Sequence, residues 1–165
     1  MPQLMRFTFC HDHEQDRIRM LAQDKEGERR AYWLTRRLTA NLLSSAERWL
    51  TECYAAKLNV PAPAQSEVYE LYHDKARDHF EQSQAMGGDT AVAEVEDTSL
   101  LIQVDIMLRD DGQLKLTFFA AGEASSWSEM SVTYFHQLLH ILQLKTELMD
   151  WGLAATQPRV SSALQ

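Results

Sequence analysis

The first 34 residues contain two segments in which apolar and polar positions alternate, a period of two that is typical of half-buried strands. The segment at the start of the chain has an apolar face formed by Met5, Phe7 and Phe9. The alternation returns over residues 17–34 and is interrupted near Gly27, which can adopt the positive φ of a tight connection. We therefore predict one strand followed by a β-hairpin.

Each arm of this predicted hairpin has an apolar side. In the first arm that side contains Ile18 and Met20. In the second arm we place Trp33 on the same core-facing side, because it alternates with the more polar neighbours. This interpretation leaves Arg30 and Tyr32 on the outer face of the sheet.

Residues 35–57 have a different period. Their apolar positions recur three or four residues apart, as in an amphipathic helix, and are Leu38, Leu42, Ala46, Trp49, Cys53 and Ala56. Thr35 is a suitable N-cap, and the helix should end near Lys57, because the prolines at 61 and 63 cannot continue it.

Residues 59–98 form an insert that is harder to interpret. The prolines favour an extended connector, and residues 66–84 have a thin apolar stripe that favours a helix capped by Ser66. The small, acidic and turn-rich stretch after it should be a loop. We expect this insert to be partly flexible.

The second half of the chain repeats the order of hairpin and helix. Residues 100–119 alternate strongly around Asp111-Gly112, a dipeptide that favours a hairpin turn, and Leu100, Ile102, Val104, Ile106 and Leu108 should share one face. A long helix is predicted over residues 128–151, with Ser128 as its cap and Gly152 as its stop.

These elements predict an α+β fold, an antiparallel sheet of about five strands with two long helices packed on one face. The hairpin-helix units at 17–57 and 100–151 form a structural pseudo-repeat without obvious residue identity. We expect a single domain over residues 1–152 and a frayed C-terminal tail over 153–165.

The charge and composition of the chain argue against two classes of function, general nucleic-acid binding and membrane association. The net charge is −8, divided into +2 over residues 1–57 and −10 over residues 58–165, and an acidic chain is a poor general binder of nucleic acid. No stretch reaches the length of a membrane span and no targeting segment is visible, so we expect no membrane association. Two cysteines, Cys10 and Cys53, are too few for a disulfide framework and favour a reduced, cytoplasmic protein.

An arginine-rich stretch is the first candidate site. Guanidinium groups suit phosphates and exposed aromatic rings stack on bases, so the hairpin predicts a weak single-stranded nucleic-acid surface made by Arg17, Arg19, Arg30, Tyr32, Arg36 and Arg37. The alternative is a solvated or self-associating face, because nearby carboxylates such as Asp24 and Glu28 neutralise much of the charge.

Histidines are the second candidate. His136 and His140 are one helical turn apart, and residues 10–13 offer a thiol, two imidazoles and a carboxylate. Together they predict a weak metal site with Cys10, His11, His13, His136 and His140 as its ligands, and a metal-dependent enzyme that uses His136 and His140 is a further alternative function. The alternative is that the helical pair is simply polar surface. A third stretch, residues 73–79, is interpreted as solvated, because its two histidines point to nearly opposite sides of a helix.

The sequence contains no recognisable motif of an enzyme or of a cofactor site. We therefore consider an enzyme less expected, and we predict no cofactor. Apolar and aromatic residues exceed what one helix layer can hide, and such residues in contiguous patches usually mark partner surfaces. We therefore expect a non-enzymatic binding or assembly protein, acting as a homodimer through its C-terminal helix or an edge strand. The alternative is that residues 66–84 cover this apolar surface within the monomer.

Overall fold

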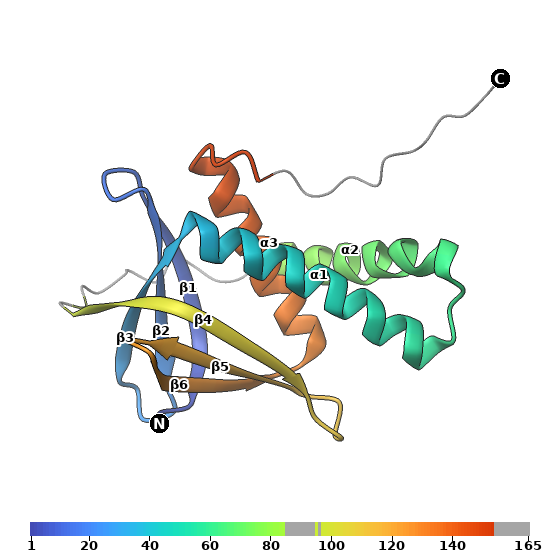
Figure 1. The fold of residues 1–165 in the computed structure, drawn as a ribbon, viewed down its shortest axis with the longest axis horizontal. Coiled ribbons are helices and arrows are strands. Elements are labelled where there is room, and N and C mark those ends of the chain that lie inside the picture. Colours follow the sequence, from blue (N-terminus) through green and yellow to red (C-terminus); the bar gives the residue numbers. More distant parts are fainter. Residues whose placement is uncertain (85–94, 96, 154–165) are drawn as a thin grey trace.

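The computed structural model describes residues 1–84, 95 and 97–153, and within them it contains six strands and three α-helices (Figure 1). In chain order these are β1 (Leu4–Asp12), β2 (Arg17–Asp24), β3 (Arg29–Thr35), α1 (Arg36–Leu58), α2 (Gln65–Gln84), β4 (Thr98–Leu108), β5 (Leu114–Ala120), β6 (Glu123–Met130) and α3 (Val132–Leu148). A short 3₁₀ turn, Ala62–Ala64, precedes α2. The predictions for the loop after α2 and for most of the tail fall outside the described residues.

The strands form one sheet in the order β1-β2-β3-β4-β5-β6. Every neighbouring pair is antiparallel except β3 and β4, which are parallel over three residue pairs, Ala31–Trp33 with Thr98–Leu100. The predicted α+β class is confirmed, but the sheet is mixed rather than antiparallel and has six strands rather than about five. The parallel step arises because helical segments carry the chain from the end of β3 back to the start of β4.

The sheet curls until its two outer strands meet. Gln3 forms an isolated bridge with Trp127, and the buried Ser128 Oγ donates a hydrogen bond to the Leu4 carbonyl oxygen at 2.6 Å. Ser128 was predicted to cap the last helix, and that prediction is wrong because residues 123–130 pair with β5 as a strand. The cap of α3 is Ser131, whose side chain accepts from the Tyr134 N–H at 3.1 Å.

The first helix begins as predicted. The Thr35 side chain accepts a hydrogen bond from the Leu38 N–H at 3.2 Å, which satisfies one of the unpaired donors of the first turn. The helix ends at Leu58, where Asn59 adopts the left-handed conformation ahead of the prolines.

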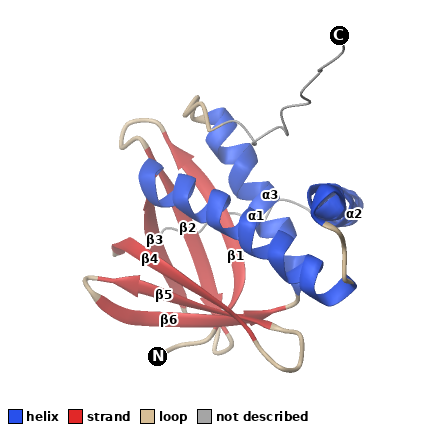
Figure 2. Cartoon of the chain, turned by 45° about the vertical axis from the view of Figure 1, so that its right-hand side comes forward, coloured by secondary structure: helices blue, strands red, loops and turns tan. Residues whose placement is uncertain are grey.

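The helices form two layers on one side of the sheet (Figure 2). Helix α3 packs on β1, and α1 packs on β3 and β4, which matches the prediction of two long helices on one face. Helix α2 makes its main contacts with α1 and α3, so it covers the helices rather than the strands. The insert at 59–98 therefore contributes a full helix to the domain.

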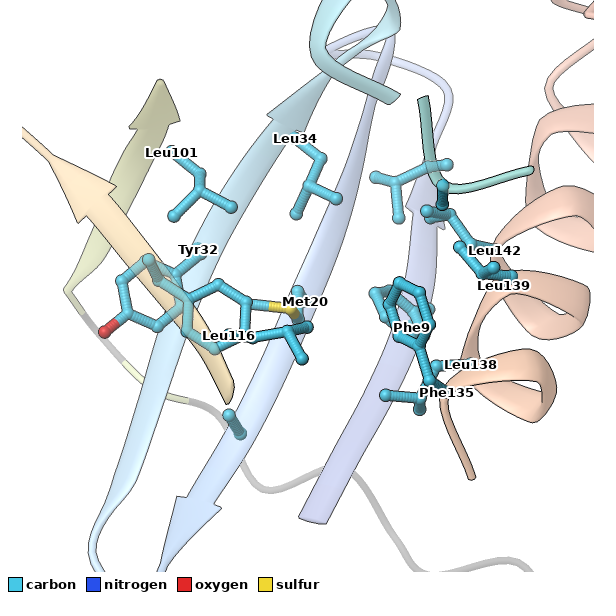
Figure 3. Packing of buried hydrophobic residues seen from close by; sticks show 14 of the residues in the cluster. Phe9, Met20, Tyr32, Leu34, Leu101, Leu116, Phe135, Leu138, Leu139 and Leu142 are labelled. Carbon is cyan, nitrogen blue, oxygen red and sulfur yellow. The ribbon is translucent and has the colours of Figure 1, made fainter. Parts of the chain in front are cut away.

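The core fills the space between the curled sheet and the first helix layer (Figure 3). Phe9, Met20, Phe135 and Leu138 all belong to it, which agrees with the predicted apolar faces at these positions. The prediction is wrong for Met5, which is 50% exposed while Leu4 is buried, because the register of β1 shifts between Leu4 and Arg6. The second arm of the hairpin differs, because Met20 pairs directly with Tyr32, and paired residues point to the same face. Tyr32 therefore lies in the core at 3% exposure, and the prediction that Trp33 holds that side is wrong.

The set of β4 side chains that points to the core switches between odd and even positions along the strand. A register shift between Leu101 and Gln103 marks a β-bulge, which reverses the alternation of side chains on either side of it. Leu101 is consequently buried at 1% exposure, whereas Leu100 and Ile102 are exposed at 42% and 49%. The prediction that all even-numbered positions from 100 to 108 share one face is therefore wrong.

The bulge predicts that alanine substitutions at two adjacent leucines lower the stability of the fold by very different amounts. Leu101→Ala should lower the free energy of unfolding by about 2–5 kcal/mol, because it leaves a cavity in the core. Leu100→Ala should cost less than about 1 kcal/mol, because its side chain is partly in solvent. Urea unfolding of both variants measures the difference, and equal losses would contradict the reversal of faces.

Candidate functional site

A cluster of histidine and tyrosine side chains joins the three helices. His136 on α3 is 1% exposed, and both of its ring nitrogens have partners. Nε2 lies 2.9 Å from the Tyr54 hydroxyl on α1, and Nδ1 lies 3.1 Å from Nδ1 of His73 on α2. A neutral His136 satisfies both contacts when Nδ1–H donates to His73 and Nε2 accepts from Tyr54.

Ring packing surrounds these hydrogen bonds. Tyr54 stacks on Tyr72 with centroids 4.4 Å apart and an interplanar angle of 8°. Tyr69 contacts the rings of His73 and His136 at 5.7 and 5.4 Å. The cluster is therefore the main polar and aromatic link between α2 and the helices beneath it.

His73 is the residue that the sequence interpretation missed. Residues 73–79 were interpreted as solvated, and this is wrong for His73, which is half-buried against His136, although His79 is exposed. The available signal was helical spacing, because Tyr69, Tyr72, His73 and the buried Ala76 lie three or four residues apart on one face of α2.

Burial controls the protonation of the cluster. Desolvation, reinforced by His73, lowers the pKa of His136 from 6.5 to about 4. Desolvation also lowers the pKa of His73, with a further contribution from His140, and it raises the pKa of the Tyr54 and Tyr69 hydroxyls. The cluster is consequently uncharged at neutral pH.

A cavity of about 680 Å³ opens beside the cluster between the three helices. Tyr69, His73 and His140 line one part of it, together with Glu47 and Glu70 from α1 and α2. Burial, followed by the neighbouring Glu70 carboxylate, raises the pKa of Glu47. The cavity thus combines aromatic, imidazole and carboxylate groups.

The predicted metal ligands are distributed over two places. His136 and His140 are in or beside the helical cluster, whereas His11 and His13 contact each other at the end of β1 with centroids 4.9 Å apart, near Cys10 in the sequence. Within residues 1–84, 95 and 97–153, no group of three or more His, Cys, Asp or Glu side chains could hold a metal ion. Both ring nitrogens of the buried His136 are already engaged in hydrogen bonds.

Several residues of the predicted nucleic-acid surface have structural roles. Tyr32 is buried and its hydroxyl lies 2.9 Å from Ser126 Oγ, so its ring cannot stack on a base, contrary to its predicted outward position. Arg19 Nε donates to Thr98 Oγ1 at 3.2 Å, its Nη2 donates to the Val95 carbonyl oxygen, and its guanidinium lies 5.8 Å from the Trp33 ring.

The remaining arginines are mostly exposed, and one of them makes a structural contact. Arg36 donates to the Trp151 carbonyl oxygen at 2.6 Å and so connects the start of α1 to the chain beyond α3. Arg30 and Arg37 are exposed, and Arg17 is half-buried where β2 pairs with the end of β3. The structure therefore removes Tyr32 from the predicted surface and places the half-buried Trp33 beside Arg19 on the outer face instead.

The edge of β4 is a second candidate site. Pairing between β3 and β4 stops at Trp33 and Leu100, and β3 itself ends at Thr35, where the chain turns into α1. Among the described residues, Leu101–Leu108 therefore pair with β5 on one side and with no strand on the other. Ile102, Met107 and Leu108 are 49%, 54% and 46% exposed along this segment.

A hollow of about 530 Å³ follows the same segment. Its lining includes Ser45 and Trp49 of α1 and residues 104–107 of β4, and it extends to Lys115 of β5. This edge thus presents backbone hydrogen-bonding groups beside an open surface of mixed polar and apolar character.

The chain itself covers only some of the apolar and aromatic side chains that exceed what one helix layer can hide. Trp151 is 2% exposed, and α2 covers Tyr54 through its stacking with Tyr72, as the intramolecular alternative predicted. The exposed leucine, isoleucine and methionine side chains of β4 are not covered by α2 in this way.

No protein-family model, curated protein or solved structure matches this chain. Among the helices in the described part of the chain, none is both long enough and apolar enough to cross a membrane.

The histidine cluster predicts that acid destabilises the fold. Because the pKa of His136 is 6.5 in the unfolded chain and about 4 in the fold, the unfolded chain binds more protons between these values. The stabilisation is complete above pH 6.5 and is lost as the pH falls toward 4, by about 3 kcal/mol for this group. His73, whose pKa is also lowered, contributes in the same direction.

Urea unfolding at neutral pH and near pH 5 measures this loss. His136→Gln should flatten the pH dependence, whereas His13→Gln, which changes an exposed histidine on the β1–β2 connection, should leave it unchanged. A wild-type stability that does not change over this range would contradict the prediction.

Two adjacent arginines provide a matched test of the contact at the start of α1. Arg36→Ala should lower the free energy of unfolding by about 1 kcal/mol, because it removes the charge-assisted hydrogen bond to the Trp151 carbonyl. Arg37→Ala, at a neighbouring position that is exposed like Arg36 but does not contact Trp151, should change it by less than about 0.5 kcal/mol. Equal thermal unfolding curves for the two variants would contradict this role of Arg36.

Proposed function

We propose that this chain is a non-enzymatic, cytoplasmic binding and assembly protein that acts as a homodimer. The observation that carries the proposal is the open edge of β4, which combines unpaired strand backbone with exposed apolar side chains over Leu101–Leu108. The cytoplasmic assignment is supported by Cys10 and Cys53, both of which are free thiols rather than a disulfide.

An open edge of this kind is a template for strand pairing. Proteins usually protect such edges with lysine, proline, a bulge that twists the strand away, or a covering segment. From Leu101 to Leu108 the sequence contains no lysine or proline, and Asp105 is its single charge. The bulge lies at the beginning of the segment, so Gln103 to Leu108 continue as a regular strand.

A second copy of the chain is the partner that fits this edge best. Two copies related by a two-fold axis present identical surfaces to each other, so one suitable edge supplies both halves of the interface. Strand addition would satisfy the backbone groups of both edges and bury Ile102, Met107 and Leu108. Homodimerisation thus accounts for the backbone and for the side chains together.

Substitutions on the exposed side chains of β4 test this function. Ile102→Lys and Met107→Lys should each shift the chain from a dimer toward a monomer of 19.0 kDa, because a lysine at the interface must be desolvated. Light scattering coupled to size-exclusion chromatography over a range of concentrations measures the mass.

Leu148→Lys is the matched control, because Leu148 is similarly exposed at 56% but lies at the end of α3. This variant should remain dimeric. A wild-type chain that stays at 19.0 kDa at high concentration would overturn the proposed function.

A further inference from the structure

We propose that two copies pair through antiparallel β4 strands with Val104 on the two-fold axis, which joins the two sheets edge to edge. This inference rests on the proposed homodimer and adds its register, and therefore the residues that meet across the interface. It follows from the order of side chains along the unpaired part of β4, from the pairing of its neighbours and from the symmetry of a dimer.

The unpaired segment is nearly palindromic about Val104. In an antiparallel pair centred there, Ile102 lies opposite Ile106 of the second copy, and the matched pairing ends at this point, because the bulge turns Leu101 into the core, away from the face of Met107. Gln103 lies opposite Asp105, and Val104 meets its own equivalent. Every pair is therefore either apolar with apolar or an amide donor with a carboxylate acceptor, which are favourable cross-strand combinations.

The Gln103–Asp105 pair already occurs within one chain. Gln103 Nε2 donates to Asp105 Oδ1 at 2.7 Å, and both side chains are exposed. Across the axis the same two groups would meet twice, once on each side of Val104. The single charge of the segment thereby has a hydrogen-bonding partner in the dimer rather than an apolar neighbour.

Symmetry and electrostatics disfavour the neighbouring registers. A two-fold axis normal to the sheet places a residue opposite its own equivalent, so the alternatives are centres at Gln103 or Asp105. The Asp105 centre brings two carboxylates directly opposite each other, which is destabilising. The Gln103 centre sets Asp105 against Leu101 and Ile106 against Leu100, whose outer edge is already paired with β3.

The surroundings of Val104 leave room for the second strand. Val104 pairs with the buried Phe118 and is itself half-buried, so its side chain faces the core side of the sheet. The hollow along residues 104–107 lies beside it and includes Trp49 of α1. The central pair of the interface would thus form next to an existing indole surface.

Disulfide trapping tests the register. The parent for the test is the full chain with Cys10→Ser and Cys53→Ser, which removes both native thiols. Directly opposed residues in an antiparallel pair have Cβ atoms about 4.5–5.5 Å apart, close to the separation a disulfide requires. Val104→Cys in this parent should therefore form a covalent dimer of twice 19.0 kDa under mild oxidation.

Gln103→Cys and Asp105→Cys are the matched controls, since each adds one cysteine to the same strand. In the proposed register, each of these residues is displaced from its own equivalent by two positions, about 7 Å along the strand. Both variants should therefore remain largely uncrosslinked under the same conditions. Trapping at either position that equals the trapping at Val104 would overturn the register.

The outcomes separate this inference from the function on which it rests. A parent protein that is dimeric by light scattering, but whose Val104→Cys variant does not crosslink, overturns the register and leaves the homodimer in place. A parent protein and wild type that are both monomeric overturn both proposals. A Val104→Cys variant whose far-ultraviolet circular dichroism matches that of the parent confirms that the comparison is made on the folded chain.

Discussion

The short parallel ladder between β3 and β4 is the constraint on which the rest of the structure depends. Its three residue pairs, Ala31–Trp33 with Thr98–Leu100, are the only strand pairing between the two antiparallel halves on this side of the described sheet. The ladder ends at Trp33, and β3 itself ends at Thr35, which caps α1 where the chain turns away from the sheet. The same event that places α1 over the core therefore leaves the rest of β4 without a neighbour.

The histidine cluster attaches helix α2, the outermost helix, to the two helices beneath it. Helix α2 contacts mainly other helices, and its link to them includes the polar contacts of His73 with His136 as well as stacked rings. A buried imidazole is tolerated when its nitrogens are hydrogen-bonded, and the Tyr54 hydroxyl completes this set. The attachment is consequently sensitive to protonation, which a purely apolar contact would not be.

Local signals in the sequence predicted much of the fold, and the errors have identifiable causes. The Thr35 cap and the Asp111-Gly112 turn depend on nearby backbone chemistry and were predicted correctly. The face of Trp33 depended on the register across the hairpin, and the alternation of β4 depended on a bulge. Strand β6 is rich in serine and glutamate, so it lacks an apolar signal, and the contact of His73 with His136 joins residues 63 positions apart.

The chemistry of the uncovered surface decides what kind of partner can cover it. A helix such as α2 can bury rings and aliphatic side chains, as it does over Tyr54, but its backbone donors and acceptors are used within the helix. The edge of β4 exposes backbone groups together with Ile102, Met107 and Leu108, and only another extended strand satisfies both. Because the strands in the described residues already pair with one another, none of them is left to complete the free edge of β4.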